Sequence, residues 1–303
     1  MKRAKLLVCF LFCSLCLFAE ANPNKARFQI IIDTDGAADD LRAICMLLSN
    51  SEIETLAITA CEGALTPAGV AQKVAELLHY FCNDEIPIGT GRALNIPSPA
   101  WRRQSEQILW GDGKNITPAG ITATDLITQT LEKTDNEIIL LCLGTLTNLN
   151  DVLTLKPELK EKIERVIWYN SSADPLRGAN YDADTTSANS ILASGIRVDI
   201  VSGEGKSETA VDEQYLDMIS KVENVYSKKI VESHSNGVLK PVVEAHHLKM
   251  WDDLAVIYLF APELFTSNNV NQTAAINLLI NADAAKQAKD IAVKILTTNK
   301  FDR

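Results

Sequence analysis

The sequence is short of basic residues and of long apolar stretches. It has 29 lysines and arginines against 39 aspartates and glutamates, which gives a formal net charge of −10 at pH 7. A nucleic-acid-binding protein neutralises phosphates with a basic surface, so this balance argues against a nucleic-acid partner. After the first residues, no apolar run reaches the roughly 20 residues that a membrane-spanning helix needs. Histidine is also scarce, and we assign no role to the 4 histidines.

The first 21 residues have the pattern of a secretory signal peptide. A basic start at residues 1–5 is followed by an apolar segment at 6–18 and a small-x-small cleavage site at 19–21. The apolar segment is too short to span a membrane. We therefore expect a mature protein of residues 22–303 that is exported to the periplasm or secreted, without membrane contact after cleavage.

Few cysteines remain once the signal segment is removed. The chain has 7, and those of the mature part are Cys45, Cys61, Cys82 and Cys142. None has a partner at metal-ligand spacing and each lies in an apolar context, which favours buried free thiols. An exported protein could also form a disulfide, and the sequence leaves both alternatives open.

Apolar runs and amphipathic segments alternate along the first two thirds of the mature chain. Short apolar runs predict strands at residues 29–33, 53–59, 137–143, 163–169 and 197–202. Helical periodicity is found at residues 39–49, 67–81, 146–155 and 185–194, and later at 214–233 and 251–260. This alternation predicts an α/β fold, Rossmann-like, with a mostly parallel central sheet flanked by helices.

Two stretches interrupt the alternation, and we expect both to be functional loops. Residues 89–120 are rich in proline, glycine and arginine, and residues 170–182 show no periodicity. After about residue 211 the pattern becomes helical. Because no repeat or linker divides the chain, we treat residues 22–303 as one domain.

The segment at residues 31–44, IIDTDGAADDLRAI, collects four carboxylates directly after a buried strand. Two unit charges about 4 Å apart repel by roughly 4 kcal/mol at an effective dielectric constant near 20. A helix N-terminus recovers only about 0.3–1 kcal/mol per acid. A cap explains one aspartate rather than four, so a divalent cation is the better explanation. Oxygen ligands without histidine or cysteine favour Ca²⁺ or Mg²⁺.

Three segments carry a resemblance to the nucleoside hydrolases. Residues 33–40, DTDGAADD, resemble the DxDxxxDD metal-binding signature of that family. Residues 144–148, GTLTN, resemble its Gly-x-Leu-Thr-Asn turn after a central strand, and residues 250–256, MWDDLAV, resemble its late metal-binding segment. The matches occur in the family's order and span most of the mature chain.

The resemblance implies a bound Ca²⁺, with Mg²⁺ as an alternative. Its protein ligands would be Asp35, Asp40, the main-chain carbonyl of Leu143 and Asp252, with Asp33 close behind. Ribose hydroxyls and one water would complete the coordination. Asp35 would also be the general base that takes a proton from this water during hydrolysis of an N-glycosidic bond.

Further roles follow from the resemblance for the substrate. Asp39 would bind a sugar hydroxyl, and Asn180 matches an asparagine that binds the ribose. Trp251, directly before the late aspartate, resembles the purine-preferring branch, in which a tryptophan stacks on the base. Trp101 is the second candidate for stacking, which is worth roughly 1–3 kcal/mol per base. Carboxylates around the sugar would stabilise the positive charge of an oxocarbenium-like transition state.

The sequence also departs from the family's pattern. Better-studied enzymes carry a glutamate that contacts the 5′ end of the ribose at the position of Gly178, and this side chain is missing. Where the family offers an asparagine to the sugar, this chain has Glu62 or Gly63, depending on the alignment. We therefore expect an intact metal site with altered sugar recognition.

Two rival interpretations stay open. A phosphatase of the haloacid dehalogenase type would use Asp33 as nucleophile, Asp35 as acid and base, and residues 252–253 for Mg²⁺. Ala37 stands where that family has threonine or valine. A periplasmic nucleoside- or sugar-binding protein without catalysis could use the same cation. Nucleoside hydrolases are commonly dimers or tetramers, so the resemblance also implies a homo-oligomer.

Overall fold

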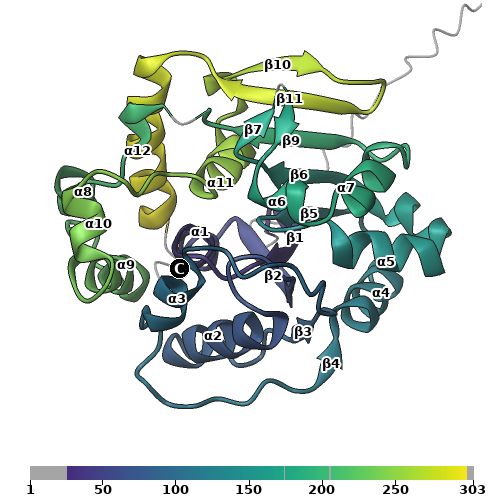
Figure 1. Ribbon diagram of the computed structural model, residues 1–303, viewed down its shortest axis with the longest axis horizontal. Coiled ribbons are helices and arrows are strands. Elements are labelled where there is room, and N and C mark those ends of the chain that lie inside the picture. The colour runs from purple at the N-terminus through teal and green to yellow at the C-terminus, as the bar shows by residue number, and fades with distance from the viewer. Residues whose placement is uncertain (1–25, 174, 205, 299–303) are drawn as a thin grey trace, which may run out of the picture.

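The structure is a computed structural model that describes residues 26–173, 175–204 and 206–298. The predicted signal peptide, residues 1–21, lies outside the described residues. Within the described part, nine strands form one sheet in the order β10-β11-β9-β6-β5-β1-β2-β3-β4 (Figure 1). All neighbours pair in parallel except β10 and β11, which confirms the mostly parallel sheet. These strands are β1 (Phe28–Thr34), β2 (Ile53–Ala60), β3 (Ile88–Thr90), β4 (Ile121–Thr122), β5 (Ile138–Cys142), β6 (Ile163–Tyr169), β9 (Val198–Ser202), β10 (Phe265–Asn269) and β11 (Ala274–Leu279).

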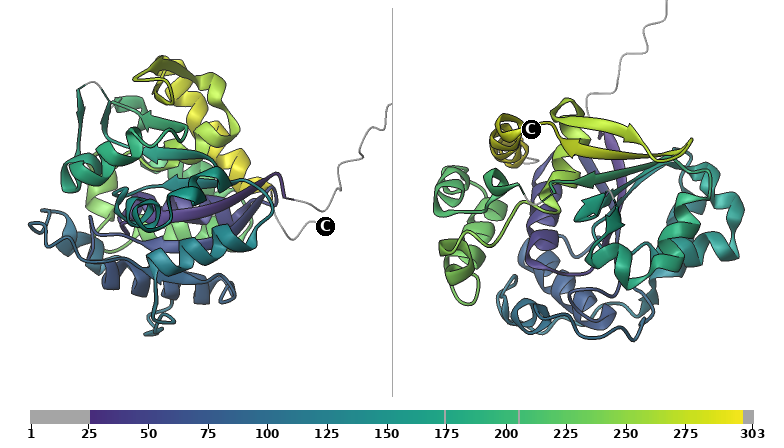
Figure 2. Two further views of the ribbon diagram at one scale, coloured as in Figure 1. Left: turned by 90° about the vertical axis from the view of Figure 1, so that its right-hand side faces the viewer. Right: turned by 45° about the horizontal axis from the view of Figure 1, so that its top comes forward.

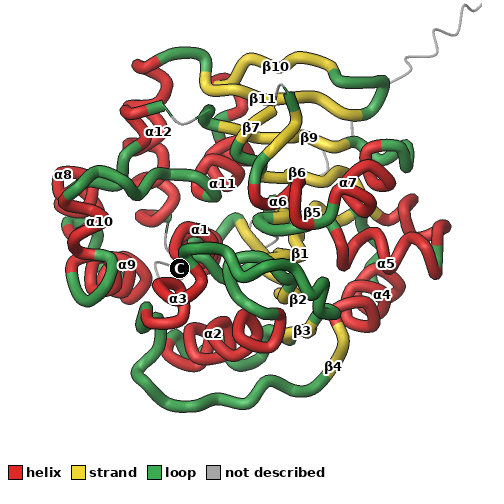
Figure 3. The backbone as a smooth tube through the Cα atoms, viewed as in Figure 1, coloured by secondary structure: helices red, strands yellow, loops and turns green. Residues whose placement is uncertain are grey.

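Helices cover both faces of the sheet, as the two views of Figure 2 show. One face carries α4 (Ala123–Lys133), α5 (Thr147–Leu155) and α7 (Thr185–Leu192). The opposite face carries α1 (Ala38–Ser49), α2 (Pro67–Tyr80), α11 (Asp253–Phe260) and α12 (Ala282–Thr297). Outside α1 and α12 lie α8 (Glu213–Ser220), α9 (Val225–Ser235) and α10 (Lys240–Glu244), at the left edge of Figure 3. Shorter elements are α3 (Arg102–Gln107), α6 (Ala179–Ala183) and the small ribbon of β7 (Ser172–Ala173) with β8 (Leu176–Arg177).

The central strands are apolar on both sides because both faces are covered. Ile30 and Ile32 of β1 pack into the core beneath α1 and α11, whereas Ile31 packs into the core beneath α4 and α5. The period of two follows from the alternation of side chains along a strand. Burial on both faces gives the near-continuous apolar runs from which these strands could be predicted.

The chain turns sharply between β1 and α1, which brings the first aspartates to one end of the sheet. Gly36 lies in this turn at φ +81°, a conformation that a residue with a side chain rarely adopts. α1 then begins at Ala38, so that Asp39 and Asp40 fall in its first turn. Negative side chains in a first turn interact favourably with the helix dipole.

The C-terminal third is less helical than expected. Residues 214–233 form two helices rather than one, since α8 ends at Ser220 and Asn224 then caps α9 by accepting a hydrogen bond from the Ser227 amide. Residues 265–279 form the β10–β11 hairpin at the edge of the sheet, so the prediction of helix after residue 211 is wrong there. The two expected loops contain the short elements β3, β7 and β8 together with helices α3 and α6.

The cysteines of the described part are free thiols. Cys45, Cys61 and Cys142 are buried, as expected, but Cys82 is exposed at the end of α2, so its predicted burial is wrong. Burial raises the pKa of Cys45, Cys61 and Cys142 above the ordinary value, which keeps these thiols protonated. Among the residues that the structure describes, no helix combines the length and the apolar character needed to cross a membrane.

Candidate active site

A pocket of about 410 Å³ opens beyond the carboxyl ends of β1, β5 and β6. Ligands of open parallel sheets bind at this edge, where loops from distant parts of the chain meet. The pocket has an acidic end, lined by Asp35, Asp39, Asp40 and Asp252. Its other walls are mainly apolar and come from α3, from the segment around α10 and from Trp251.

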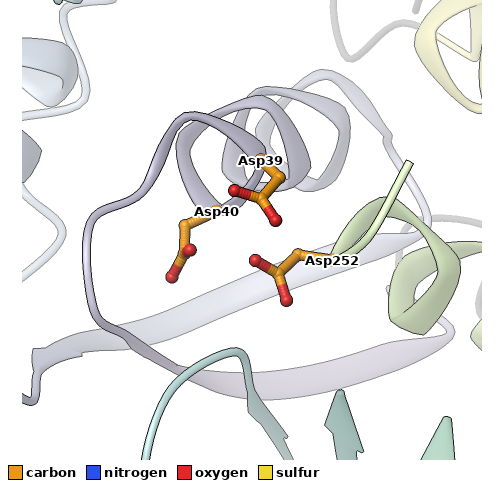
Figure 4. A group of neighbouring side chains, drawn as sticks. All are labelled: Asp39, Asp40 and Asp252. Atoms are coloured by element: carbon orange, nitrogen blue, oxygen red, sulfur yellow. The ribbon is translucent and has the colours of Figure 1, made fainter. Parts of the chain in front are cut away.

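Three carboxylates at the acidic end lie close enough to share one ion. Asp39 and Asp40 come from the first turn of α1, and Asp252 directly precedes α11. One carboxylate oxygen from each lies within 4.8 Å of the other two (Figure 4). We call Asp39, Asp40 and Asp252 the carboxylate trio.

Hydrogen bonds from the β1–α1 turn hold Asp40 in place. Its Oδ1 accepts from the Thr34 hydroxyl at 2.5 Å, from the Asp35 amide at 2.9 Å and from the Gly36 amide at 3.4 Å. All three bonds go to one oxygen, so the carboxylate is oriented by the backbone of the same signature segment. Asp252 is the member of the trio with an unsatisfied oxygen, since its buried Oδ1 has no hydrogen-bond partner among the described residues.

The donor set fits a hard cation. An unpartnered carboxylate oxygen costs free energy when it is buried, and a cation bound between the three side chains would satisfy it. The ligands are all oxygens, which Ca²⁺ and Mg²⁺ prefer. Residues Asp39, Asp40 and Asp252 are therefore the side chains that could hold Ca²⁺.

Asp35 lines the pocket beside the trio but is not part of it. Its Oδ1 accepts a hydrogen bond from the Ala37 amide at 3.3 Å. Two glycines give it room: a Cβ on Gly63 would lie 2.1 Å from Asp35 Oδ2, and a Cβ on Gly144 would lie 2.9 Å from Asp35 Cβ. The close approach explains why these two positions lack side chains.

Asp33 lies behind the pocket and does not line it. Its Oδ1 accepts hydrogen bonds from the Thr59 hydroxyl at 2.6 Å and from the Asn148 side-chain amide at 2.7 Å. Its Oδ2 is buried without a partner among the described residues. Asn148 belongs to the GTLTN segment, so the first and second signature segments meet at Asp33 as well as at Asp35, where Gly144 approaches.

Burial and mutual repulsion dominate the electrostatics of these acids. Burial, followed by the charge of Asp40, raises the pKa of Asp35 and of Asp252 well above the ordinary value. The same two causes raise the pKa of Asp39 from 3.8 to about 7, although Arg42 opposes the shift. Burial raises the pKa of Asp40 as well, against the hydrogen bonds that it accepts. The acids alone therefore resist ionising together, and a nearby positive charge would relieve this repulsion.

Leu143 and Asn180 meet at the pocket wall. The Asn180 side-chain amide donates to the Leu143 carbonyl at 2.7 Å and to the Tyr169 carbonyl at 3.1 Å. The Leu143 carbonyl predicted as a metal ligand thus already accepts one hydrogen bond. Both donor bonds use the nitrogen of Asn180, and this residue lines the pocket, as does Tyr169.

The two predicted stacking residues both line the pocket. Trp251 is half-buried, whereas Trp101 at the start of α3 is 45% exposed. Ile108, Leu239 and Leu248 complete an apolar wall between them. A flat aromatic ligand portion could be held here, because the wall offers two indole rings and few polar groups.

The departures from the family's pattern have structural consequences. Gly178 adopts φ +122°, and a Cβ at this position would lie 2.1 Å from the Ser171 hydroxyl. A glutamate therefore does not fit this backbone. Glu62 is buried and faces away from the pocket lining, because its carboxylate accepts from the amides of Leu94 and Asn95.

Three residues of this region escaped the sequence analysis. Tyr169 and His247 line the pocket, and Arg42 lies buried behind the trio. A charged residue on an otherwise apolar helix face was the available signal for Arg42. Tyr169 closes β6, whose apolar run predicts only core packing. For His247 the available signal was its place shortly before the Trp251 segment, although a solvated histidine pair is the interpretation that the sequence favours there.

A mostly parallel sheet with an acid-lined, cation-compatible pocket beyond its strands defines an α/β protein with a ligand site at this edge. The family model described as inosine-uridine preferring nucleoside hydrolase matches residues 30–302, and the chain belongs to this family. It is therefore a hydrolase of N-glycosyl bonds that acts on ribonucleosides, and its family is metal-dependent.

Individual relatives are distant but cover most of the chain. The non-specific ribonucleoside hydrolase RihC of Escherichia coli is 26% identical over 259 residues, which are 79% of this chain and 81% of the relative. The pyrimidine-specific ribonucleoside hydrolase RihA of Shewanella oneidensis is 24% identical, with 79% and 80% covered. The solved purine-preferring ribonucleoside hydrolase from Gardnerella vaginalis shares the fold, with a TM-score of 0.71, 17% identity, and 89% of this chain and 99% of that chain covered.

Proposed function

We propose that the protein hydrolyses purine ribonucleosides to free base and ribose, and that this activity depends on Ca²⁺. The observation that carries the proposal is the unsatisfied Oδ1 of Asp252 within the carboxylate trio, at the end of a pocket whose other wall is aromatic. When bound, Ca²⁺ supplies Lewis acidity and orients the hydroxyl groups of the sugar. The trio holds the ion, and the acidic end of the pocket takes the ribose.

Asp35 is the general base of the proposed reaction. It lines the same pocket as the trio, and its Oδ1 accepts a hydrogen bond from the Ala37 amide. Its raised pKa means that it needs positive charge nearby to ionise at neutral pH. With the trio's negative charge compensated, Asp35 accepts a proton from the water whose oxygen bonds to the anomeric carbon as the N-glycosidic bond breaks. The purine leaves with the electron pair of that bond and takes up one proton to give the free base. Asp33 supports this arrangement from behind, through its hydrogen bonds with Thr59 and Asn148.

The aromatic wall supports the preference for purines. Trp101 and Trp251 can both contact a base, and the larger surface of a purine gains more from stacking than that of a pyrimidine. The named relatives differ in base preference: one is pyrimidine-specific, one non-specific and one purine-preferring. Asn180 is a candidate partner of the sugar hydroxyls, as is the carboxylate oxygen of Asp39 that does not hold the ion, and the 5′ position meets no glutamate at Gly178.

The two rival functions are disfavoured by specific contacts. A phosphatase would need Asp33 as an exposed nucleophile, but Asp33 lies behind the pocket with one oxygen bound to Thr59 and Asn148. A binding protein without catalysis would not need a carboxylate at position 35, which has room only because positions 63 and 144 are glycines. We further propose that the mature protein, residues 22–303, is exported and assembles as a dimer or tetramer.

A substrate panel tests the proposed function. The protein is incubated with inosine, guanosine and uridine in Ca²⁺, and the released base and reducing sugar are measured. We expect release from all purine nucleosides, with a higher kcat/KM for inosine and guanosine than for uridine. Faster release from uridine would contradict the purine preference. Tight binding of a nucleoside without release would indicate a binding protein, and hydrolysis of p-nitrophenyl phosphate a phosphatase.

A further inference from the structure

A buried arginine lies directly behind the carboxylate trio. Arg42 of α1 forms a bidentate pair with Asp253 of α11, with Nε–Oδ1 at 2.7 Å and Nη2–Oδ2 at 2.5 Å. Both side chains are fully buried. A planar guanidinium and a carboxylate that meet through two parallel bonds have a fixed separation and a fixed orientation.

The pair joins the two elements that carry the trio. Arg42 follows Asp40 by two residues in α1, and Asp253 follows Asp252 directly. α1 and α11 pack against each other although 211 residues separate the two partners of the pair. The bonds between Arg42 and Asp253 therefore join the helix that carries Asp39 and Asp40 to the residue that follows Asp252.

Further hydrogen bonds hold Arg42 in one orientation. Nη2 donates to the Lys249 carbonyl at 2.9 Å, and Nη1 lies 2.8 Å from Nε2 of His234. Burial and the charge of Arg42 lower the pKa of His234 to about 3, so the imidazole is neutral. Its Nδ1 donates to the Ile230 carbonyl at 2.8 Å, which leaves Nε2 to accept from Arg42. The guanidinium is thus also hydrogen-bonded to α9 and to the segment before Trp251.

Core packing alone does not account for this network. A buried ion pair loses the hydration of both charges, and well-packed apolar residues of similar volume often give an equally stable or more stable core. What the ion pair adds to apolar packing is a fixed distance and a fixed orientation between its two side chains. We propose that Arg42 and Asp253 are a positioning pair, which holds Asp39 and Asp40 at ion-binding distance from Asp252 and thereby sets the affinity for the cation. The inference rests on the ion site of the proposed function.

A double variant separates positioning from stability. Arg42→Met with Asp253→Leu removes both charges together, so that no unpaired charge is left buried. The matched control is Arg165→Met with Asp199→Leu, a second largely buried pair that joins β6 and β9 away from the pocket lining. Affinity is measured for the metal alone, by calorimetry with Ca²⁺ and by Tb³⁺ luminescence, and folding by circular dichroism.

We expect the Arg42/Asp253 double variant to bind Ca²⁺ about 10–100-fold more weakly, the loss typical when the groups that orient metal ligands are removed. The control should stay within about twofold of the wild type. Saturating Ca²⁺ should restore nucleoside hydrolysis in the Arg42/Asp253 variant. Unchanged Ca²⁺ affinity in this variant, or an equal loss in the control, would overturn the proposal.

Arg42→Lys covers the case in which the double variant does not fold. It keeps the charge but loses the two parallel bonds, so Ca²⁺ affinity should fall while the fold is retained. Wild-type affinity in Arg42→Lys would also overturn the proposal. A wild-type protein that binds no Ca²⁺ would instead contradict the proposed function, whereas a Ca²⁺-binding wild type with unaffected variants would contradict the positioning pair alone.

Discussion

When divalent ions are removed, the contribution of Asp39 to the stability of the protein should fall as the pH rises. Asp39 is the clearest source of this dependence, because burial and the charge of Asp40 raise its pKa from 3.8 to about 7. Between these two values the folded protein holds a proton that the unfolded chain has released. The contribution of Asp39 to the free energy of unfolding therefore decreases as the pH rises from about 4 to about 7.

The size of the effect follows from the pKa shift. One pKa unit corresponds to about 1.36 kcal/mol. A carboxyl group whose pKa is raised from 3.8 to about 7 on folding therefore lowers the free energy of unfolding by on the order of 4 kcal/mol at high pH. His234 has the opposite effect on the pH dependence of stability, because its pKa is lowered from 6.5 to about 3 in the folded protein. Its contribution to the free energy of unfolding is therefore lost as the pH falls below about 6.5. A comparison of the wild type with Asp39→Asn cancels the histidine.

The assay is denaturant unfolding in a chelator at several pH values. Relative to Asp39→Asn, the wild type should lose on the order of 4 kcal/mol between pH 4 and pH 8. Added Ca²⁺ should reverse the trend for the wild type, since ion binding requires deprotonated carboxylates and becomes tighter as the pH rises. A difference between the two proteins that stays constant from pH 4 to pH 8 would refute the electrostatic reasoning.

Three further predictions concern single side chains of the pocket. Asp35→Ala should lower kcat about 10²–10⁴-fold while Ca²⁺ still binds, as expected for loss of a general base; full turnover in this variant would assign the base elsewhere. Trp251→Ala should weaken inosine binding by about 1–3 kcal/mol, measured as an increase in KM, and an unchanged KM would exclude stacking. Gly63→Ala should reduce turnover without unfolding the protein, because its Cβ would lie 2.1 Å from Asp35 Oδ2; wild-type activity would show that Asp35 need not keep this position.

Much of the fold could be predicted because the central strands are buried on both faces. The apolar runs at β1, β2, β5, β6 and β9 leave little choice of structure, and the predicted range of β6 is the observed one. β10 could not be recognised, because four of its five residues are exposed and polar or small, without alternation. An edge strand that pairs on one side has little need of apolar residues.

The candidate site could be predicted in part for a similar reason. Asp39, Asp40 and Asp252 lie in short segments whose residue types already point to an ion, and the structure brings them together. The partner of Arg42 lies 211 residues away, so no local pattern could identify it. The orientation of the Glu62 side chain could not be predicted either, because it depends on hydrogen bonds from the amides of Leu94 and Asn95, more than 30 residues further along the chain.

The central claim is that a hard cation binds between Asp39, Asp40 and Asp252. Diffraction from crystals grown with Ca²⁺ tests it most directly, because the anomalous signal locates the ion independently of the protein coordinates. The account predicts one fully occupied ion whose oxygen ligands, at about 2.3–2.6 Å, include carboxylates of the trio. An ion bound elsewhere, or no ion at saturating Ca²⁺ with the trio's carboxylates paired to one another, would contradict it.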